Sequence, residues 1–481
     1  ADSLDELVQL GLTIDDCETQ VVSCTTDEVR ALYQDRQTLT TAYNQLTAEL
    51  ILDTDIVTPQ PSDLITEGVA EVLASQPNTM LIYPVVLSDR LVLLWATRGG
   101  VANAIEVPGV TEADINSTAF EFRRLMRQCE TQGCTTADIP ALQAEAQKLH
   151  RWLIPQDLDT VLQQQGIENL VFALDQQLRY IPMAALHNGE QYLVERYTLS
   201  TVTAAWLTPV ANPLPTNPAE VSVLALGLSE EVTDNNPNDD IPYFAPLNYV
   251  PLELDGIVQS PDEAEPDGVY PGLKLLNQDF DDGAFFNLKI DGHQILHIAT
   301  HGMFVPTNLD ASFLMLGTKQ DWRISEIQNI QQQFTDLSLV VLSACETALG
   351  GPQQSAADAQ ALDGREISGI AQTFLDAGAD AILASLWKVS DGSTSALMQQ
   401  FYLELAKGTD ANPVTYSAAL QQAQVRILTG NVDPAVAETL TRGLVEWGEA
   451  PESGDGSATA TLPDLSHPFY WAPFTLIGNG L

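Results

Sequence analysis

Residues 295–302 read ILHIATHG, and residues 337–347 read LSLVVLSACET. Each begins as a short, nearly continuous apolar run, and AILASLW at 381–387 is a third run of this kind. Helical patterns alternate with these runs, at about residues 324–331, 366–377 and 393–406. Strands that are buried on both faces of a parallel sheet have this appearance, so the second half of the chain predicts an α/β fold.

Two of these predicted strands run directly into reactive residues. The first is followed by His301 and Gly302, and the second by Cys345. Ligands of open parallel sheets bind beyond the carboxyl ends of the strands, so these residues share one edge if their strands are neighbours. A thiol becomes an effective nucleophile when a nearby imidazole removes its proton. We therefore predict that Cys345 is a nucleophile and His301 its general base.

Backbone donors complete this predicted site. The N–H groups of Gly302 and Cys345 are the natural donors to a developing oxyanion, and one such donor typically contributes about 3–4 kcal/mol. No acidic third member is identifiable in the sequence. Taken singly, each residue also has a structural interpretation. Cys345 could be a small buried apolar residue, and His301 a histidine at a strand end whose hydrogen bonds are all made within the fold.

A metal site is a competing interpretation of the same segment. His293, His297 and His301 recur every four residues, which on a helix would place them on one face. The apolar and β-branched residues of ILHIAT favour a strand instead, and the HExxH glutamate is missing. We expect no metal and no cofactor, and a supporting or buried role for His297.

The rest of the chain predicts three parts. Residues 1–75 read as a helical segment without tetratricopeptide periodicity. Residues 76–215 begin with a hairpin, MLIYPVVL and LVLLWAT, followed by helices at about 115–129 and 139–165 and a strand, NLVFAL. The proline-rich TPVANPLPTNPAE then reads as a linker, so the predicted catalytic part is 216–481.

The charge of the chain narrows its partners. It has 65 Asp and Glu against 20 Lys and Arg, which gives a formal net charge of −45. Such a surface repels phosphates, so we expect no nucleic-acid partner. Dispersed acidic residues usually form a solvated surface, with a dock for basic partners as the alternative. No run of 18 apolar residues is present, so we expect no membrane span.

Five cysteines leave one unmatched. Cys17 and Cys24 lie close together, as do Cys129 and Cys134, and Cys345 stands alone. The two pairs could be disulfides in an oxidising compartment, which favours an extracytoplasmic location over a cytoplasmic one. The first residue is Ala and no signal peptide is visible, as expected for a processed or excised chain. Cysteine pairs without neighbouring histidines are poor zinc sites.

Several strings together resemble a known family. They are LHIATHGMF, VVLSACETALG, DGREISGIAQTFLDAGADAILASLWKVSDGSTSALMQQFYLELAKG and the ending HPFYWAPFTLIGNG. They closely resemble the CHAT family of caspase-like domains associated with tetratricopeptide repeats. The likeness covers residues 220–481, and PVVLSDRLVLLWAT and LRYIPMAALHNGEQYLVERY resemble the amino-terminal part of the same domain.

This resemblance implies a fold and an activity. The fold is the caspase-hemoglobinase type, related to separase, with a mainly parallel sheet flanked by helices and an amino-terminal α+β half. The family histidine falls on His301 and its cysteine on Cys345, and the spacing fits caspases, where histidine precedes cysteine by about 50 residues. The implied function is a cysteine endopeptidase that cleaves selected proteins through a thioester.

The resemblance also bears on partners. It implies a protein or peptide substrate and an activating repeat-protein partner. A catalytically silent caspase-like scaffold or interaction module is the alternative, because a fold alone does not establish activity.

Cleavage specificity does not follow from the resemblance. The chain has SACE at 343–346 where caspases have Q-A-C-[RQG]-G, so cleavage after aspartate is not implied. The substrate groove is expected beside the dyad, at Ser343, Ser385, Trp387 and Asp391. An acidic pocket at Asp391 would favour a basic residue before the scissile bond. Alternatively, Trp387 is a core residue and Asp391 caps the next helix.

The loop at 350–364 follows the predicted nucleophile and is rich in small residues. Loops in this position commonly become ordered or are cut on activation, and a plain flexible connection fits the composition equally well.

Overall fold

The computed structural model describes a defined part of the chain, which is residues 73, 78–97, 103–203, 214–232, 243–259, 268–283, 292–305, 308–327, 337–343, 365–387, 390–446 and 463–480. The chain divides into two compact units, Ala1–Asp63 and Leu64–Leu481, and all described residues belong to the second. The predicted amino-terminal helix, Cys17, Cys24, Cys345 and the 350–364 loop lie outside the described residues.

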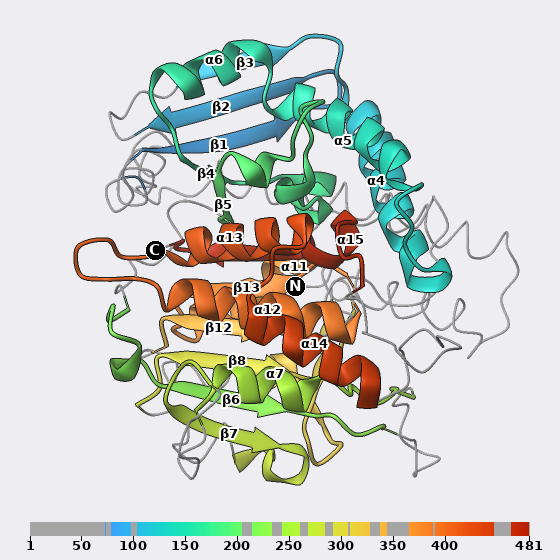
Figure 1. Ribbon diagram of the computed structural model, residues 1–481. Helices are drawn as coiled ribbons and strands as arrows, with labels where there is room; N and C mark the ends of the chain where they lie inside the picture. The colour runs from blue at the N-terminus through green and yellow to red at the C-terminus, as the bar shows by residue number, and fades with distance from the viewer. Residues whose placement is uncertain are drawn as a thin grey trace, which may run out of the picture. The chain divides into compact units, whose positions relative to one another are not determined.

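The described residues form one sheet of eleven strands, in the order β3-β2-β1-β4-β5-β14-β13-β12-β8-β6-β7 (Figure 1). Their bounds are β1 Thr79–Val86, β2 Leu91–Thr97, β3 Asn103–Val107, β4 Asn169–Phe172, β5 Thr198–Thr201, β6 Val223–Gly227, β7 Gly272–Leu276, β8 Ile295–Ala299, β12 Leu339–Leu342, β13 Ala381–Ser385 and β14 Phe474–Gly478.

The carboxyl-terminal part of this sheet is mainly parallel. β12 lies between β8 and β13, parallel to both, with Leu342 opposite Ile298 on one side and Ala384 on the other. The condition under which His301 and Cys345 would share one edge, that their strands are neighbours, is therefore met, and the third strand also lies next to the cysteine strand. β14 runs antiparallel to β13 and was not predicted as a strand, and neither was β7 at the edge.

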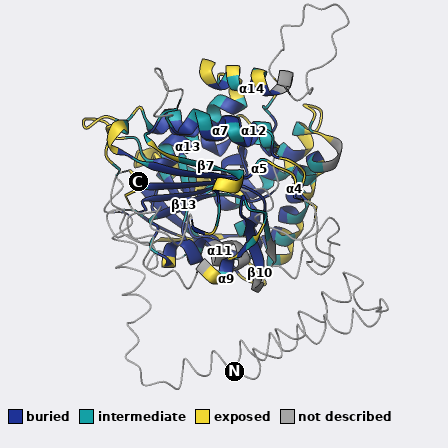
Figure 2. Cartoon of the chain, turned by 90° about the horizontal axis from the view of Figure 1, so that it is seen from below, coloured by how far each residue is buried: buried dark blue, intermediate teal, exposed yellow. Residues whose placement is uncertain are grey.

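Helices cover both faces of the sheet, as continuous apolar strands require. Along β12, Leu339 and Val341 enter one core while Val340 and Leu342 enter another. The helices on the first face include α7 (Val250–Ile257), α12 (Asp391–Leu405), α13 (Tyr416–Thr429) and α14 (Pro434–Glu446). The opposite face carries α9 (Ile324–Ile327) and α11 (Arg365–Asp376) (Figure 2). The predicted α/β class is thus confirmed.

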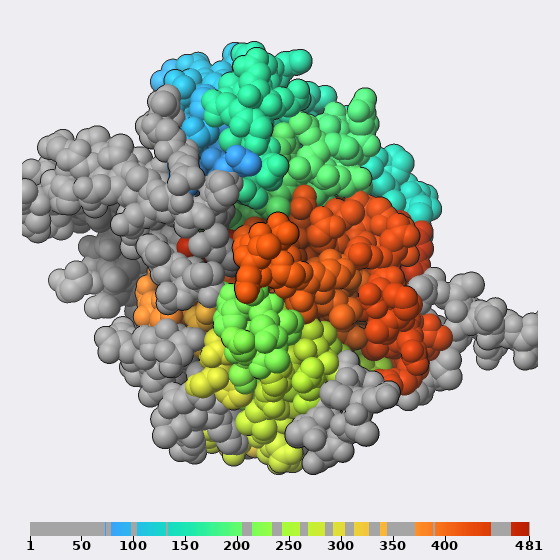
Figure 3. Space-filling model, turned by 60° about the vertical axis from the view of Figure 1, so that its left-hand side comes forward, coloured from blue at the N-terminus to red at the C-terminus, as the bar shows by residue number. Residues whose placement is uncertain are grey.

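The amino-terminal part extends the same sheet. The predicted hairpin is present as β1 and β2, and β1 then pairs in parallel with β4 and β4 with β5. β5 meets β14 where Thr201 lies opposite Ile477. Hydrogen-bonded strands therefore run from the amino-terminal to the carboxyl-terminal part, and on one face the blue-to-green and orange-to-red segments are in direct contact (Figure 3).

Local sequence explains how the amino-terminal helices begin and end. α4 (Glu112–Gln132) begins at a capping box between Thr111 and Asp114. The stretch predicted as one helix over 139–165 is two helices, α5 (Ile139–Leu153) and α6 (Gln156–Gln164). Pro155 separates them, because the residue before a proline is disfavoured in the helical conformation.

A short helix, α15 (Pro468–Trp471), precedes β14. Among the helices described here, none is both long and apolar enough to cross a lipid bilayer.

Candidate active site

His301 lies just beyond the carboxyl end of β8 and is held on one side by the loop before α7. Its Nε2 is 2.8 Å from the carbonyl oxygen of Ala245, and its ring stacks on Phe244 with centroids 4.7 Å apart. Only 5% of the residue is exposed. A carbonyl can only accept a hydrogen bond, so the contact assigns the proton to Nε2 and makes Nδ1 the basic nitrogen.

The backbone of His301 is fixed by a second, three-stranded sheet. This sheet has the order β11-β10-β9, formed by Asp321–Arg323, Asn308–Met315 and Gly302–Val305. The Met315 N–H donates to the His301 carbonyl at 2.8 Å, and Gly302 lies opposite Leu314. The chain thus leaves the large sheet at His301 and enters a small antiparallel one.

The end of β12 lies beside the end of β8. The Ser343 N–H donates to the Ile298 carbonyl at 2.9 Å, which continues the parallel pairing by one residue. Ser343 is two positions before Cys345, whose thiol is outside the described residues. The structure therefore brings the strand that leads to Cys345 next to the strand that leads to His301.

Four buried polar side chains meet behind these two strand ends, and we call them the Glu253 cluster. Glu253 Oε1 accepts a hydrogen bond from Ser343 Oγ at 2.7 Å and lies 2.8 Å from His297 Nε2. His297 Nδ1 is 3.2 Å from the Tyr402 hydroxyl. Burial raises the pKa of the Tyr402 phenol well above its usual value, so the phenol stays protonated.

The Glu253 cluster contains two residues that were singled out in the sequence, His297 and Ser343. His297 was expected to be supporting or buried, and it is fully buried within strand β8. Ser343 was expected at the substrate groove, but its hydroxyl points to Glu253 and the residue is only 5% exposed.

The competing metal interpretation needed a helix. Residues Ile295–Ala299 form a strand, so His293, His297 and His301 do not line a helical face. His293 instead contacts Ser222, with Nδ1 2.8 Å from Oγ.

The other three predicted groove residues follow the third strand. Ser385 ends β13 and is buried, and Trp387 packs in the apolar core with 5% exposure. Asp391 is the first residue of α12, and its carboxylate accepts the Tyr249 N–H at 2.7 Å. Asp391 thus holds the loop that also holds His301.

Sequence reasoning missed Phe244, Ala245, Glu253 and Tyr402. A backbone carbonyl carries no side-chain signal, so Ala245 could not be found from the sequence. Glu253 had a usable signal, because it is a carboxylate between two buried leucines of an apolar helix, VPLELDGI. Carboxylates are almost never fully buried unless they are paired.

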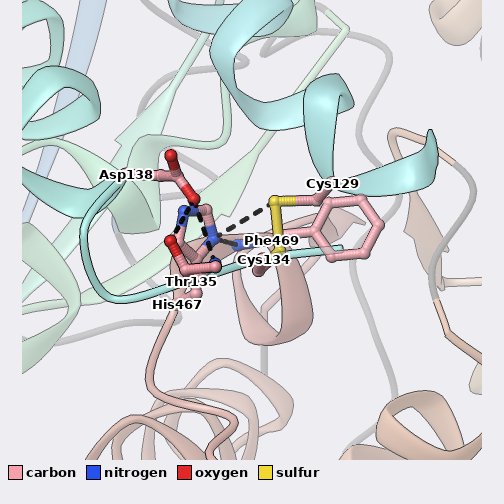
Figure 4. The surroundings of a disulfide bond; sticks show 6 residues. All are labelled: Cys129, Cys134, Thr135, Asp138, His467 and Phe469. Carbon is pink, nitrogen blue, oxygen red and sulfur yellow. Dashed lines mark hydrogen bonds between the residues drawn. A yellow bond between two sulfur atoms is a disulfide. The ribbon is translucent and has the colours of Figure 1, made fainter. Parts of the chain in front are cut away.

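A second polar centre lies elsewhere in the described structure. Cys129 and Cys134 form a disulfide, and Cys129 Sγ is 3.8 Å from Nδ1 of His467, which comes just before α15 (Figure 4). His467 is buried, and its Nδ1 accepts the Phe469 N–H at 3.1 Å. Burial lowers the pKa of His467, against the opposing effect of Asp138 and Asp464.

These three residues are the one group of potential metal ligands found among the described residues. The sequence interpretation had discounted zinc because no histidine neighbours these cysteines, and the fold supplies one from far along the chain. The two sulfurs are bonded to each other, however, so neither is a thiolate that could bind a metal.

Comparisons with known proteins place these features in a family. No curated protein matches the chain. Two structures of the Saccharomyces cerevisiae separase–securin complex share 11% identity with it, at TM-scores of 0.46 and 0.49. They cover 74% and 86% of this chain, which spans only 29% and 31% of the separase chains. A structure of Porphyromonas gingivalis RgpB shares 10% identity with this chain, at a TM-score of 0.34. The match covers 78% of this chain and 77% of the RgpB chain.

A family model gives the direct match. The model of the CHAT domain matches residues 143–479, which is more than half of the chain. The matched segment includes β8 and β12, the loop that holds His301 and the whole Glu253 cluster. The chain therefore belongs to the CHAT domain family.

Proposed function

We propose that this chain is a cysteine endopeptidase that cleaves selected protein substrates, with Cys345 as nucleophile and His301 as general base. The observation that carries the proposal is the hydrogen bond between His301 Nε2 and the Ala245 carbonyl at the edge where β8 and β12 end together. That bond orients the imidazole and makes Nδ1 the nitrogen that would take a proton. A backbone carbonyl thus fills the place for which the sequence offered no acidic residue.

The chemistry runs in two halves. The Cys345 thiol gives its proton to His301 Nδ1 as Sγ bonds to the scissile carbonyl carbon. The oxyanion is bound by the N–H groups of Gly302 and Cys345, and the departing amine takes the proton from His301. Water then attacks the thioester carbonyl carbon and loses a proton to His301. The C–S bond breaks, the carboxylic acid is released, and His301 returns the proton to the Cys345 sulfur.

Selectivity and activation complete the proposal. The substrate is a protein or peptide segment bound beside the dyad, along the side of the sheet where Ser385 ends β13 and Trp387 and Asp391 follow it. A repeat-protein partner would supply activation. Family membership supports a peptidase, and the finer assignment depends on the reactivity of Cys345.

The test is covalent labelling of the whole chain with a panel of peptidyl acyloxymethyl ketones under reducing conditions. We expect one adduct per chain, located at Cys345, and none on Cys345→Ala. His301→Ala should slow labelling by roughly a hundredfold or more, because general base catalysis contributes on that order. The matched control is His293→Ala, in a histidine just before β8 that contacts Ser222, and its labelling rate should equal that of wild type.

The competing function is a catalytically silent scaffold. Folded wild-type chain that forms no adduct, with or without a repeat-protein partner, would exclude the peptidase and favour the scaffold. Equal labelling of wild type and His301→Ala would remove His301 from the mechanism.

A further inference from the structure

The Glu253 cluster is built from four separate elements of the fold. Glu253 comes from α7, His297 from β8, Ser343 from the end of β12 and Tyr402 from α12. None is more than 5% exposed, and three are at 1% or less. Buried carboxylates and imidazoles are costly unless they form hydrogen bonds. The four side chains of this cluster supply those hydrogen bonds to one another in place of water.

The hydrogen bonds of the cluster run in consistent directions. Ser343 donates to Glu253, and His297 donates to the same oxygen when its proton is on Nε2. Tyr402, kept protonated by burial, then donates to His297 Nδ1. Each donor meets an acceptor, and both chains of bonds end on the Glu253 carboxylate.

Glu253 thereby joins the two strands that lead to the dyad. His297 is four residues before His301, and Ser343 is two residues before Cys345. Both side chains contact one oxygen of Glu253, so the two strand ends are fixed to a common point on α7.

The same helix continues into the loop that holds His301. Phe244 stacks on the His301 ring, and the Ala245 carbonyl accepts the hydrogen bond from His301 Nε2. Both residues precede α7 by a few positions. α7 is also close to the sheet, because a Cβ on Gly227 of β6 would come within 2.7 Å of Val250 and 2.8 Å of Leu254. A shift of α7 is therefore transmitted to the loop that orients the His301 ring.

We propose that Glu253 is a positioning residue for the peptidase reaction: it sets the relative placement of the His301 and Cys345 strand ends through His297 and Ser343. The inference rests on the proposed function and adds a residue that contacts neither substrate nor the reacting atoms. Its loss should slow the chemical step and leave substrate binding unchanged, because small misplacements of reacting groups cost up to about a hundredfold in rate.

The first experiment separates inhibitor binding from bond formation in the labelling reaction. Glu253→Ala should lower the maximal inactivation rate by about tenfold to a hundredfold, with the inhibitor's binding constant within about twofold of wild type. Glu253→Gln keeps an acceptor oxygen at the same place and should stay within about threefold of wild type. Ser343→Ala, a smaller change that removes one donor, should also lower the maximal rate.

The matched control is Glu404→Ala. Glu404 is also a buried carboxylate, 6% exposed, but it lies on α12 and pairs with Lys407 and Arg426. The Glu404→Ala variant should have a lower free energy of unfolding than wild type but the same maximal inactivation rate. A folded Glu253→Ala with the wild-type rate, or an equal loss of rate in Glu404→Ala, would overturn the proposal.

A second readout does not depend on peptidase activity. Imidazole ¹⁵N NMR of the histidine-labelled chain should show His301 and His297 each as one tautomer with the proton on Nε2. In Glu253→Ala, His301 should become a mixture of tautomers, whereas in Glu404→Ala it should not. If labelling fails on wild type but the NMR change occurs, the peptidase is wrong and the positioning role stands. An unchanged His301 spectrum in folded Glu253→Ala contradicts the positioning role.

Discussion

At the scale of single residues, His301 is held by atoms that no motif specifies. A main-chain oxygen accepts from its ring and a phenylalanine lies flat against it. Both come from the same short loop, and that loop is in turn fixed by Asp391 through the Tyr249 N–H. Asp391 therefore has a structural task that the sequence interpretation did not foresee.

This task gives a prediction for Asp391. Asp391→Ala should lower the free energy of unfolding by about 1–3 kcal/mol, because the buried Tyr249 N–H loses its acceptor. Asp391→Asn keeps an oxygen in place and should lose less. Urea unfolding of the three proteins measures the difference, and an alanine variant as stable as wild type would contradict the structural role.

The acidic-pocket hypothesis for Asp391 has its own test. A peptide-library cleavage profile of wild type would show a preference for a basic residue before the scissile bond if Asp391 lines a pocket. A profile without that preference would show that Asp391 does not line a substrate pocket.

At the scale of elements, the Cys129–Cys134 disulfide links the last turn of α4 to the segment that follows the helix, next to α15. Cys129 lies in the last turn of α4, and Gly133 follows the helix with a positive φ of 73°. His467 connects this end of α4 to the segment that becomes β14, which lies next to β13 in the sheet.

The disulfide predicts a redox-dependent difference in stability. Its two cysteines are five positions apart, and so short a loop should contribute about 2 kcal/mol. Cys134→Ser should therefore lower the free energy of unfolding by about this amount without reductant and should match wild type with reductant. Unfolding curves under both conditions measure it.

Alkylation followed by peptide mapping checks the bond itself. Without reductant, Cys129 and Cys134 should stay unlabelled in the unfolded chain, and with reductant both should be labelled. Labelling of both before reduction would rule out the disulfide.

At the scale of the whole molecule, several histidines are buried and resist protonation. Burial lowers the pKa of His150 from 6.5 to about 4, against the opposing effect of Asp159. It also lowers the pKa of His187, His293 and His467. In this pH range the unfolded chain binds protons that the folded chain does not, so folding stability falls as pH falls from about 6.5 towards 4.

His150 allows this effect to be measured separately. From about pH 7 to about pH 5, wild type should lose about 2 kcal/mol more unfolding free energy than His150→Gln, which has no proton to bind. At lower pH the acidic residues become protonated and repel one another less, which also changes the free energy of unfolding. This change is the same in both proteins, so it drops out of the difference between them. Parallel pH dependences would show that His150 does not titrate as its burial predicts.

The sequence by itself predicted strands such as β8, β12 and β13, proposed the His301–Cys345 dyad and indicated the family. Apolar runs such as ILHIAT and LVVL can be interpreted from neighbouring residues alone, because strand burial and side-chain alternation are local properties. The sequence left open whether the histidine and cysteine strands are neighbours, and the parallel pairing of β8 and β12 shows that they are. The roles of His301 and Cys345 in catalysis remain predictions.

Only the tertiary structure decided what surrounds the dyad strands. Glu253 contacts His297, which is 44 positions away in the sequence, and Ser343, which is 90 positions away. Cys129 and His467 are 338 positions apart. Such contacts depend on which helix crosses which strand, and a single sequence carries no record of that. The sequence therefore names the residues that would react, and the packing of α7 against the sheet decides how they are held.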